Sequence, residues 1–148
     1  MLDNDFIRKK LSALVKHLKE LDALAQLTLA EYKADFIRRH AAEKVVELIV
    51  EYALDINRAI VEANQAEPPQ TGYNTFLEME RLGILPSGLT ARLASTTGLR
   101  NRLVHRYDEL DNKAVYHSLQ PLLRDYRQYA RLIQAYLNRA EAKPSKRK

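Results

Sequence analysis

The sequence predicts an all-α protein, an up-and-down helical bundle of four long helices plus short helices. Only four glycines and five prolines occur in 148 residues, so few residues interrupt a helix. In each long segment, apolar residues recur three or four positions apart, which is the pattern of a helix with one buried face. We find no strand-like alternation, internal repeat or second domain. We therefore expect one helical domain over residues 1–142 and a basic flexible tail over residues 143–148.

Polar caps mark the beginnings of the first two long helices. Asp3 or Asn4 can cap a helix whose apolar stripe reaches Leu24. Asp35 can cap a second helix from about Phe36 to Ala63, which no glycine or proline interrupts. At 1.5 Å per residue, this second helix spans roughly 40 Å.

Two short elements are predicted beside these long helices. Thr28 and Glu31 form a capping-box pattern, which opens a short turn before the second long helix. A short helix from about Asn74 to Leu82 follows a proline-rich loop, and Gly83 is placed to end it.

The last two long helices contain residues that disfavour a helix. Ser87 can cap a helix from about Leu89 to Tyr107, in which Gly98 is an internal weak point. The last helix runs from about Lys113 to Arg139. We expect Pro121 to start a new turn within this helix or to kink it.

Composition excludes several classes of site. The chain has no cysteine, so disulfides, thiolate zinc sites and cysteine nucleophiles are ruled out. The scattered glycines match no phosphate-binding loop. No Glu is followed by a His three residues later, as a carboxylate-bridged di-metal site in a bundle would require. The four histidines lie far apart, at His17, His40, His105 and His117. We expect neither a metal nor another cofactor.

The positive charge of the chain is concentrated in the tail. The chain carries 24 Lys and Arg against 19 Asp and Glu, a net charge of +5, and residues 143–148 hold four positive charges and no negative one. The preceding residues therefore have a net charge of +1, which does not by itself indicate a nucleic-acid-binding surface. The sequence begins without the apolar core of a signal peptide and has no apolar run of about 20 residues. We expect a cytoplasmic protein that does not enter a membrane.

The densest polar cluster lies at residues 100–107, near the end of the fourth long helix. It contains three arginines, a histidine, an asparagine and a tyrosine. Asn101 and His105 are four residues apart and share a helix face. Arg100 and His105 are five residues apart, about 140° around the helix axis. We therefore expect a second helix or a second subunit to complete any site here.

This cluster has the residues needed to cleave a phosphodiester. Histidine exchanges a proton near neutral pH, and arginine clamps phosphate and stabilises the charge of the transition state. Without a metal, the 2′-OH of RNA is the convenient nucleophile, so RNA is favoured over DNA. The alternative is a solvated surface at the helix end, where positive side chains lie near the C-terminal, negative end of the helix dipole.

Supporting roles are open for two further residues. Asp55 interrupts an apolar run, where an unpaired charge would be costly. It either holds Arg100 or Arg102 in place or forms a structural ion pair. Arg102 is a candidate contact for RNA phosphate, with solvated surface as the alternative.

The pattern Arg100-x4-His105-x-Tyr107, at a helix end in an all-α chain of this length, resembles the motif of the HepT-type toxins of the HEPN superfamily. Asn101 after the arginine and the order of the helices strengthen the resemblance, which covers about residues 3 to 140. It implies a metal-independent endoribonuclease toxin of a type VII-like toxin–antitoxin pair. It also implies a homodimer with the active site between subunits, in which Arg100 and His105 are catalytic.

The resemblance also implies a partner and a modification. The cognate antitoxin of this family is a minimal nucleotidyltransferase, which can neutralise the toxin by transferring AMP to the motif tyrosine, here Tyr107. The added phosphates would bring negative charge and bulk into a groove meant for RNA. The RNA substrate, messenger or transfer RNA, stays open.

Two alternatives to an enzyme are retained. The first is a non-catalytic helical module that binds a nucleotide or acts as a scaffold partner of a nucleotidyltransferase, in which the same arginines hold phosphate without turnover. The second is a plain structural dimer, in which Arg100 and His105 could be changed without consequence.

Overall fold

A computed structural model describes residues 2–64, 67, 69–105 and 111–142 of the chain. This described part contains six helices and no strand, which confirms the predicted all-α class. In chain order, the helices are α1 (Asn4–Ala25), α2 (Leu29–Ala34), α3 (Phe36–Ala63), α4 (Gly72–Arg81), α5 (Ser87–His105) and α6 (Asn112–Ala142). The predicted tail over residues 143–148 lies outside the described residues.

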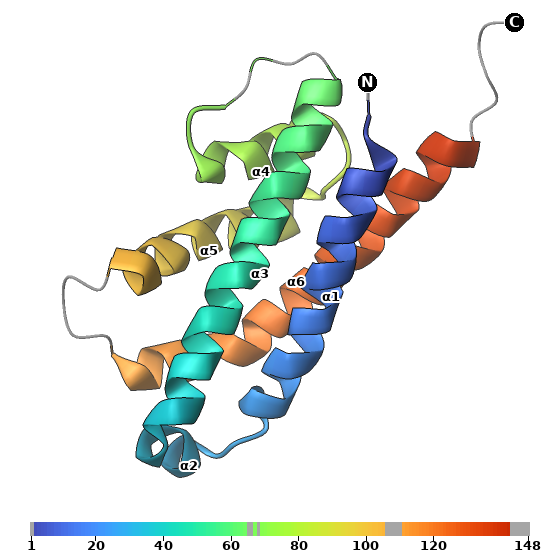
Figure 1. The fold of residues 1–148 in the computed structure, drawn as a ribbon. Coiled ribbons are helices and arrows are strands. Elements are labelled where there is room, and N and C mark those ends of the chain that lie inside the picture. The colour runs from blue at the N-terminus through green and yellow to red at the C-terminus, as the bar shows by residue number, and fades with distance from the viewer. Residues whose placement is uncertain (1, 65–66, 68, 106–110, 143–148) are drawn as a thin grey trace, which may run out of the picture.

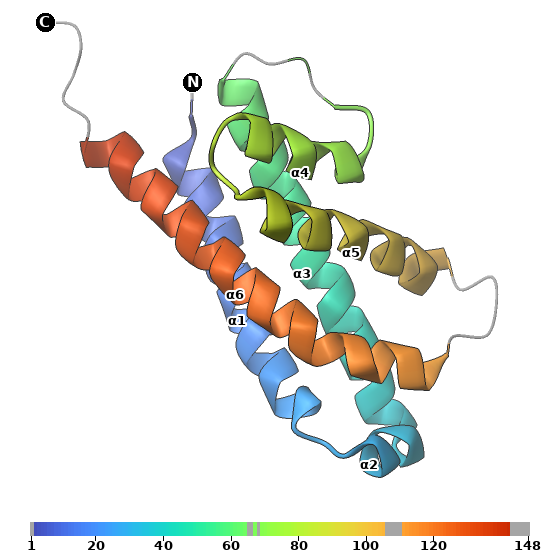
Figure 2. The same cartoon turned by 180° about the vertical axis from the view of Figure 1, so that it is seen from behind.

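The four long helices surround one core. α1 packs against α3 and α6 and runs antiparallel to both, while α5 packs against α3, α4 and α6 (Figure 1). Seen from behind, α5 and α6 lie in front, and α5 crosses α3 obliquely (Figure 2). The short helices α2 and α4 cover opposite ends of α3. None of the described helices combines the length and apolar character needed to cross a bilayer.

The predicted caps of the first helices are present. Asp3 accepts a hydrogen bond from the Phe6 amide at 3.0 Å, which caps α1. Asp35 accepts from the amides of Ile37 and Arg38, both at 3.1 Å, and caps α3. The predicted bounds of α3 are confirmed, as is the capping box that opens α2.

α4 starts earlier than predicted, at Gly72 rather than Asn74. The reason is the cap: the Thr71 hydroxyl accepts a hydrogen bond from the Asn74 amide at 3.2 Å, so Gly72 already belongs to the first turn. Gly83 follows the helix with a φ of +79°, a conformation that favours glycine, and it confirms the predicted end.

α5 also starts two residues earlier than predicted. The Pro86 carbonyl accepts the first helical hydrogen bond, from the Thr90 amide at 2.9 Å. Ser87 is therefore the first residue of α5, and the expectation that it caps the helix is wrong. Gly98 does not interrupt the helix. α6 likewise continues through Pro121 as one helix, with Asp111 as its cap.

A buried polar network ties α3 to α4 and α6. The Tyr129 hydroxyl donates to Asn57 Oδ1 at 2.7 Å, and Asn57 Nδ2 donates to Thr75 Oγ1 at 3.1 Å. All three side chains are fully buried. Burial raises the pKa of Tyr129 well above its ordinary value. Because each group finds its partner only when three helices are correctly placed, the network specifies their relative positions.

We expect Tyr129→Phe to lower the free energy of unfolding by about 1–3 kcal/mol, because Asn57 Oδ1 would remain buried without its donor. Tyr136→Phe is the matched control. Its half-exposed hydroxyl receives only a 3.4 Å contact from Asn64, so its loss should cost less than about 0.5 kcal/mol. Urea denaturation measures both variants. Equally small decreases in the free energy of unfolding of both variants would show that the network contributes little to stability.

Candidate active site

Four of the predicted site residues lie on the last two turns of α5: Arg100, Asn101, Arg102 and His105. Tyr107 lies outside the described residues. Leu93, Ala94 and Leu103 are buried and anchor this helix in the core. Because the anchoring residues continue to Leu103, the turn that carries the polar cluster is held by packing on its inner side.

Arg100 is held by a carboxylate from another helix. Its Nη2 lies 2.9 Å from Glu51 Oε2 of α3, and the two side chains are 29% and 39% exposed. Arg100 Nη1 also contacts Asn101 Oδ1, at 3.5 Å. Arg100 Nε is buried and has no hydrogen-bond partner among the described residues. The guanidinium is thus oriented by a carboxylate and an amide oxygen, and the exposed part of the side chain remains accessible to a ligand.

Asp55 does not hold either arginine. It forms an ion pair with Lys10 of α1 at 3.0 Å, so of the two roles left open for Asp55, the structural ion pair is the one observed. Glu51 precedes Asp55 by four residues, about 6 Å along α3. Both carboxylates interrupt the same apolar run, and only the packing of α1 and α5 against α3 shows which one faces Arg100.

The remaining motif residues face solvent. Asn101, Arg102 and His105 are exposed, and Arg102 forms no ion pair with another described residue. His105 is five residues from Arg100, about 7.5 Å along the axis and 140° around it. Arg102 and His105 lie in the last described turn of α5, where positive charge interacts favourably with the helix dipole. The structure therefore brings together Arg100, Asn101 and Glu51, and presents His105 separately at the helix end.

The other histidines have different surroundings. His17 stacks on Tyr52 with ring centroids 5.5 Å apart, and its Nδ1 lies 2.6 Å from Glu20 Oε1. His40 and His117 are exposed on α3 and α6. None of the three shares a helix with Arg100, so His105 is the histidine that accompanies it.

This arrangement suits the handling of a phosphate. An arginine held at one edge can donate two hydrogen bonds to a phosphate or phosphorane without losing its orientation. An exposed imidazole on the same helix can exchange a proton with the reacting group. Within the described residues, no three His, Asp or Glu side chains gather in a way that could hold a metal ion.

Comparisons with known proteins identify the family of this chain. Residues 14–133 match the family model described as ribonuclease HepT-like. The tRNA nuclease HepT of Aphanizomenon flos-aquae is 31% identical over 131 residues, which cover 88% of this chain and 89% of that protein. The mRNA nuclease HepT of Shewanella oneidensis is 26% identical over 132 residues, covering 89% and 98%.

A solved structure shares the fold. The tri-AMPylated HEPN toxin of Shewanella oneidensis, in complex with an MNT antitoxin, superposes with a TM-score of 0.83 at 26% identity, covering 90% of this chain and 99% of that one. The matched family range includes Glu51 of α3 and all of α5. The chain therefore belongs to the HepT-like family of ribonucleases.

Proposed function

We propose that this protein is an endoribonuclease toxin that cleaves RNA at the end of α5, with Arg100 and His105 as its catalytic pair and without a metal ion. The observation that carries the proposal is the orientation of Arg100 by Glu51, 2.9 Å away on a different helix. A solvated helix end would not require a carboxylate from α3 to hold one arginine. The nuclease names of the two HepT relatives support the same reaction class.

The proposed cleavage uses the RNA's own hydroxyl. His105 removes the proton of a 2′-OH, and the resulting oxygen attacks the adjacent phosphorus. The bond from phosphorus to the 5′-oxygen breaks, and that oxygen takes up a proton as it leaves. The products are a 2′,3′-cyclic phosphate and a free 5′-hydroxyl. Arg100 stabilises the negative charge that develops on the phosphorane oxygens.

A second copy of the chain completes the site in this proposal. Arg100 and His105 point about 140° apart on one helix, so neither α5 alone nor α5 with Glu51 encloses a phosphate. Val104, between them in sequence, is an exposed apolar residue. A homodimer that packs these helix ends together would cover Val104 and form a cleft with two Arg100–His105 pairs.

The proposed partner is a minimal nucleotidyltransferase that acts as the antitoxin. The related Shewanella toxin is AMPylated in its complex with such a protein. Transfer of AMP to the hydroxyl of Tyr107 would release pyrophosphate from ATP and place a phosphodiester two residues after His105. The new negative charge would repel RNA phosphate from the site. The substrate is RNA, for which the named relatives offer both transfer and messenger RNA.

We expect Arg100→Ala and His105→Ala each to lower the rate of RNA cleavage at least about 100-fold, because each removes one of the two catalytic groups. Arg38→Ala and His40→Ala are the matched controls, since both residues are exposed on α3. Cleavage of total RNA, followed on gels with circular dichroism as a folding check, gives the answer. Full activity in both site variants would refute the proposal. If the unaltered protein binds RNA but does not cleave it, the result favours the alternative of a non-catalytic scaffold protein.

Glu51 acts as a positioning residue, so Glu51→Ala should lower kcat about 10- to 100-fold with little change in KM. Glu51→Gln should recover part of the loss, because the amide oxygen can still accept a hydrogen bond from Arg100 Nη2. Asp55→Ala is the control. It removes a carboxylate one turn away that pairs with Lys10, and cleavage should be unchanged. An equal effect of the two alanine variants would contradict the role of Glu51.

Co-expression with a nucleotidyltransferase antitoxin of the proposed kind should increase the intact mass of this protein by a whole number of AMP units. The increase should be lost in Tyr107→Phe, because the acceptor hydroxyl is gone. Tyr73→Phe, which removes an exposed hydroxyl on α4, should keep it. Mass spectrometry of the intact protein decides the matter. An AMP adduct that persists in Tyr107→Phe would place the modification elsewhere.

A further inference from the structure

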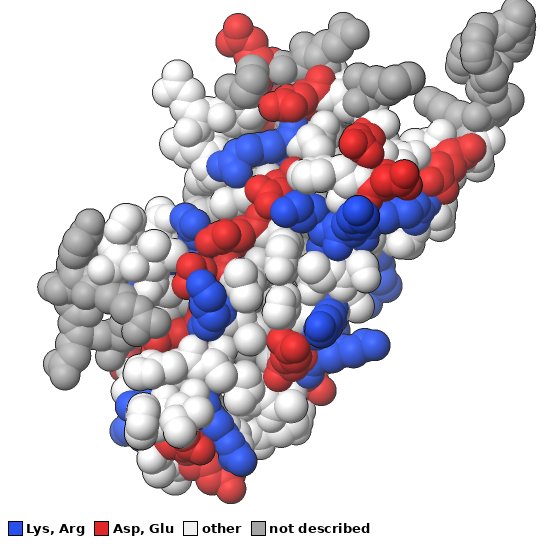
Figure 3. Space-filling view, viewed as in Figure 1, with Lys and Arg blue, Asp and Glu red and all other residues white. Residues whose placement is uncertain are grey.

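The helices differ in charge although the body of the chain is nearly neutral. α1, α5 and α6 together carry thirteen Lys and Arg against five Asp and Glu. α2, α3 and α4 carry six against eight. Figure 3 shows a line of acidic side chains over α3 and a cluster of basic side chains over α1 towards α6. The small net charge therefore conceals an excess of positive charge on α1, α5 and α6. We use the name basic face for the part of it formed by Lys16 and Lys19 of α1, Arg92 of α5, and Arg124 and Arg131 of α6.

A groove of about 620 Å³ runs between α1 and α6 on this face. Its lining contains no Asp or Glu and four positively charged side chains: Arg8, Lys16, Lys19 and Arg131. Arg8 pairs with Glu141 at one end. The other three form no ion pair with any residue in the described ranges. Three unpaired cations around one groove attract a ligand with several negative charges.

The floor of the groove is apolar. Leu11, Val15 and Ala130 contribute to it between the charged side chains. Leu11 and Ala130 belong to the core, while Val15 is only partly buried. The groove therefore combines three unpaired cations with an aliphatic floor. Its positive charge is the feature that lets a groove follow the backbone of a single-stranded nucleic acid.

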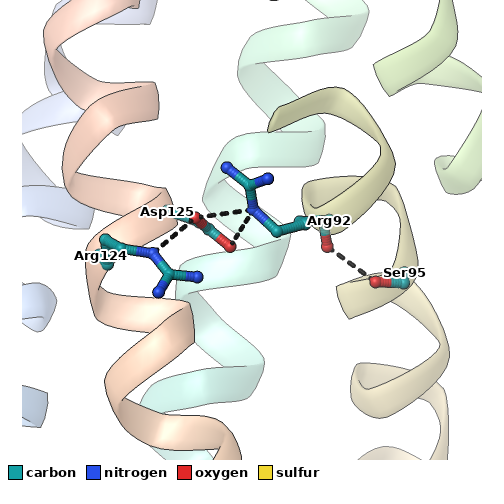
Figure 4. Close-up of polar contacts among 4 residues, drawn as sticks. All are labelled: Arg92, Ser95, Arg124 and Asp125. Atoms are coloured by element: carbon teal, nitrogen blue, oxygen red, sulfur yellow. Dashed lines mark hydrogen bonds and ion pairs between the residues drawn. The ribbon is translucent and has the colours of Figure 1, made fainter. Parts of the chain in front are cut away.

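The basic face continues across α6 to α5. Asp125 of α6 is buried, and both of its oxygens lie 3.1 Å from Arg92 Nε of α5. Arg124 Nε reaches the same carboxylate at 3.3 Å (Figure 4). The arginine side chains are 50% and 65% exposed, so Asp125 fixes their inner ends while their outer N–H groups face solvent. Arg92 thus links α6 to α5, the helix that carries Arg100, and the guanidinium group of Arg124 is oriented beside it.

We propose that single-stranded RNA binds along this basic face, with its phosphates on Lys16, Lys19 and Arg131 in the groove and on Arg92 and Arg124 beyond it. This inference rests on the proposed function, because RNA is there the substrate. It adds a binding surface that is separate from the catalytic residues and that uses the α1–α6 side of the molecule. Its role is to increase affinity for a segment of RNA that is not cleaved.

The test is a double charge reversal, Lys16→Glu with Arg131→Glu, made in the His105→Ala background so that RNA stays intact. Binding of a fluorescent single-stranded RNA is measured as a function of salt. We expect Kd to rise at least about 10-fold near 0.1 M salt. The slope of log Kd against log salt should fall by about 1.4, since each lost phosphate contact contributes about 0.7. Thermal melting followed by circular dichroism checks the fold.

The matched control is Lys33→Glu with Lys44→Glu, which makes the same change in net charge on exposed residues of α2 and α3. Its affinity should stay within about twofold of the parent. Equal weakening by both double variants would mean that only total charge matters and would overturn the inference. The groove variant could instead keep its RNA affinity and lose binding to the co-expressed nucleotidyltransferase. That result would identify the groove as a protein-docking surface and would also overturn the inference.

The outcomes separate this inference from the proposed function. A protein that binds RNA through the groove but never cleaves it would refute the ribonuclease proposal and leave the binding surface established. The opposite result is a protein that cleaves RNA at the same rate with and without the groove substitutions, measured at RNA concentrations below Kd. That result would support the ribonuclease proposal and refute the binding surface.

Discussion

The burial of α3 is the constraint on which the rest of the structure depends. This helix contacts α1, α2, α4 and α5, and no glycine or proline breaks its 28 residues. Asn57 makes its placement specific, because this buried amide is satisfied only when Thr75 of α4 and Tyr129 of α6 are both in position. Six residues before Asn57, Glu51 therefore has a fixed location. α5 packs against the same helix, and Arg100 meets Glu51 there.

Stability and the proposed catalysis depend on different polar contacts in this molecule. The Tyr129–Asn57–Thr75 network is fully buried, so its loss leaves unsatisfied groups in the core. The Arg100–Glu51 pair is partly exposed, and such pairs add little to stability. In the proposed mechanism the importance of this pair is orientation, because Glu51 holds the guanidinium that meets the phosphate. A similar arrangement occurs at Asp125, where a buried carboxylate of α6 orients Arg92 of α5 and Arg124 of α6.

The sequence predicts most of the fold, because caps and apolar periodicity are local signals. Asp3, Asp35 and the bounds of α3 are confirmed on that basis. The site is only partly predictable. Asp55 and Glu51 both interrupt one apolar run, and the packing of neighbouring helices decides which one meets Arg100. The basic face is not predicted for a related reason. The charges of each helix can be counted in the sequence, but only the packing shows that α6 lies beside both α1 and α5.

The central claim is that side chains at the end of α5 activate the 2′-hydroxyl of RNA for attack on its own phosphate. The most direct test replaces a single nucleotide, at a bond the protein has been shown to cleave, by its 2′-deoxy equivalent and measures cleavage with EDTA present. Loss of cleavage at that bond alone, with 2′,3′-cyclic phosphate ends at unmodified bonds, is the result the account predicts. Continued cleavage at the deoxy position would contradict it, because the nucleophile would then have to come from elsewhere.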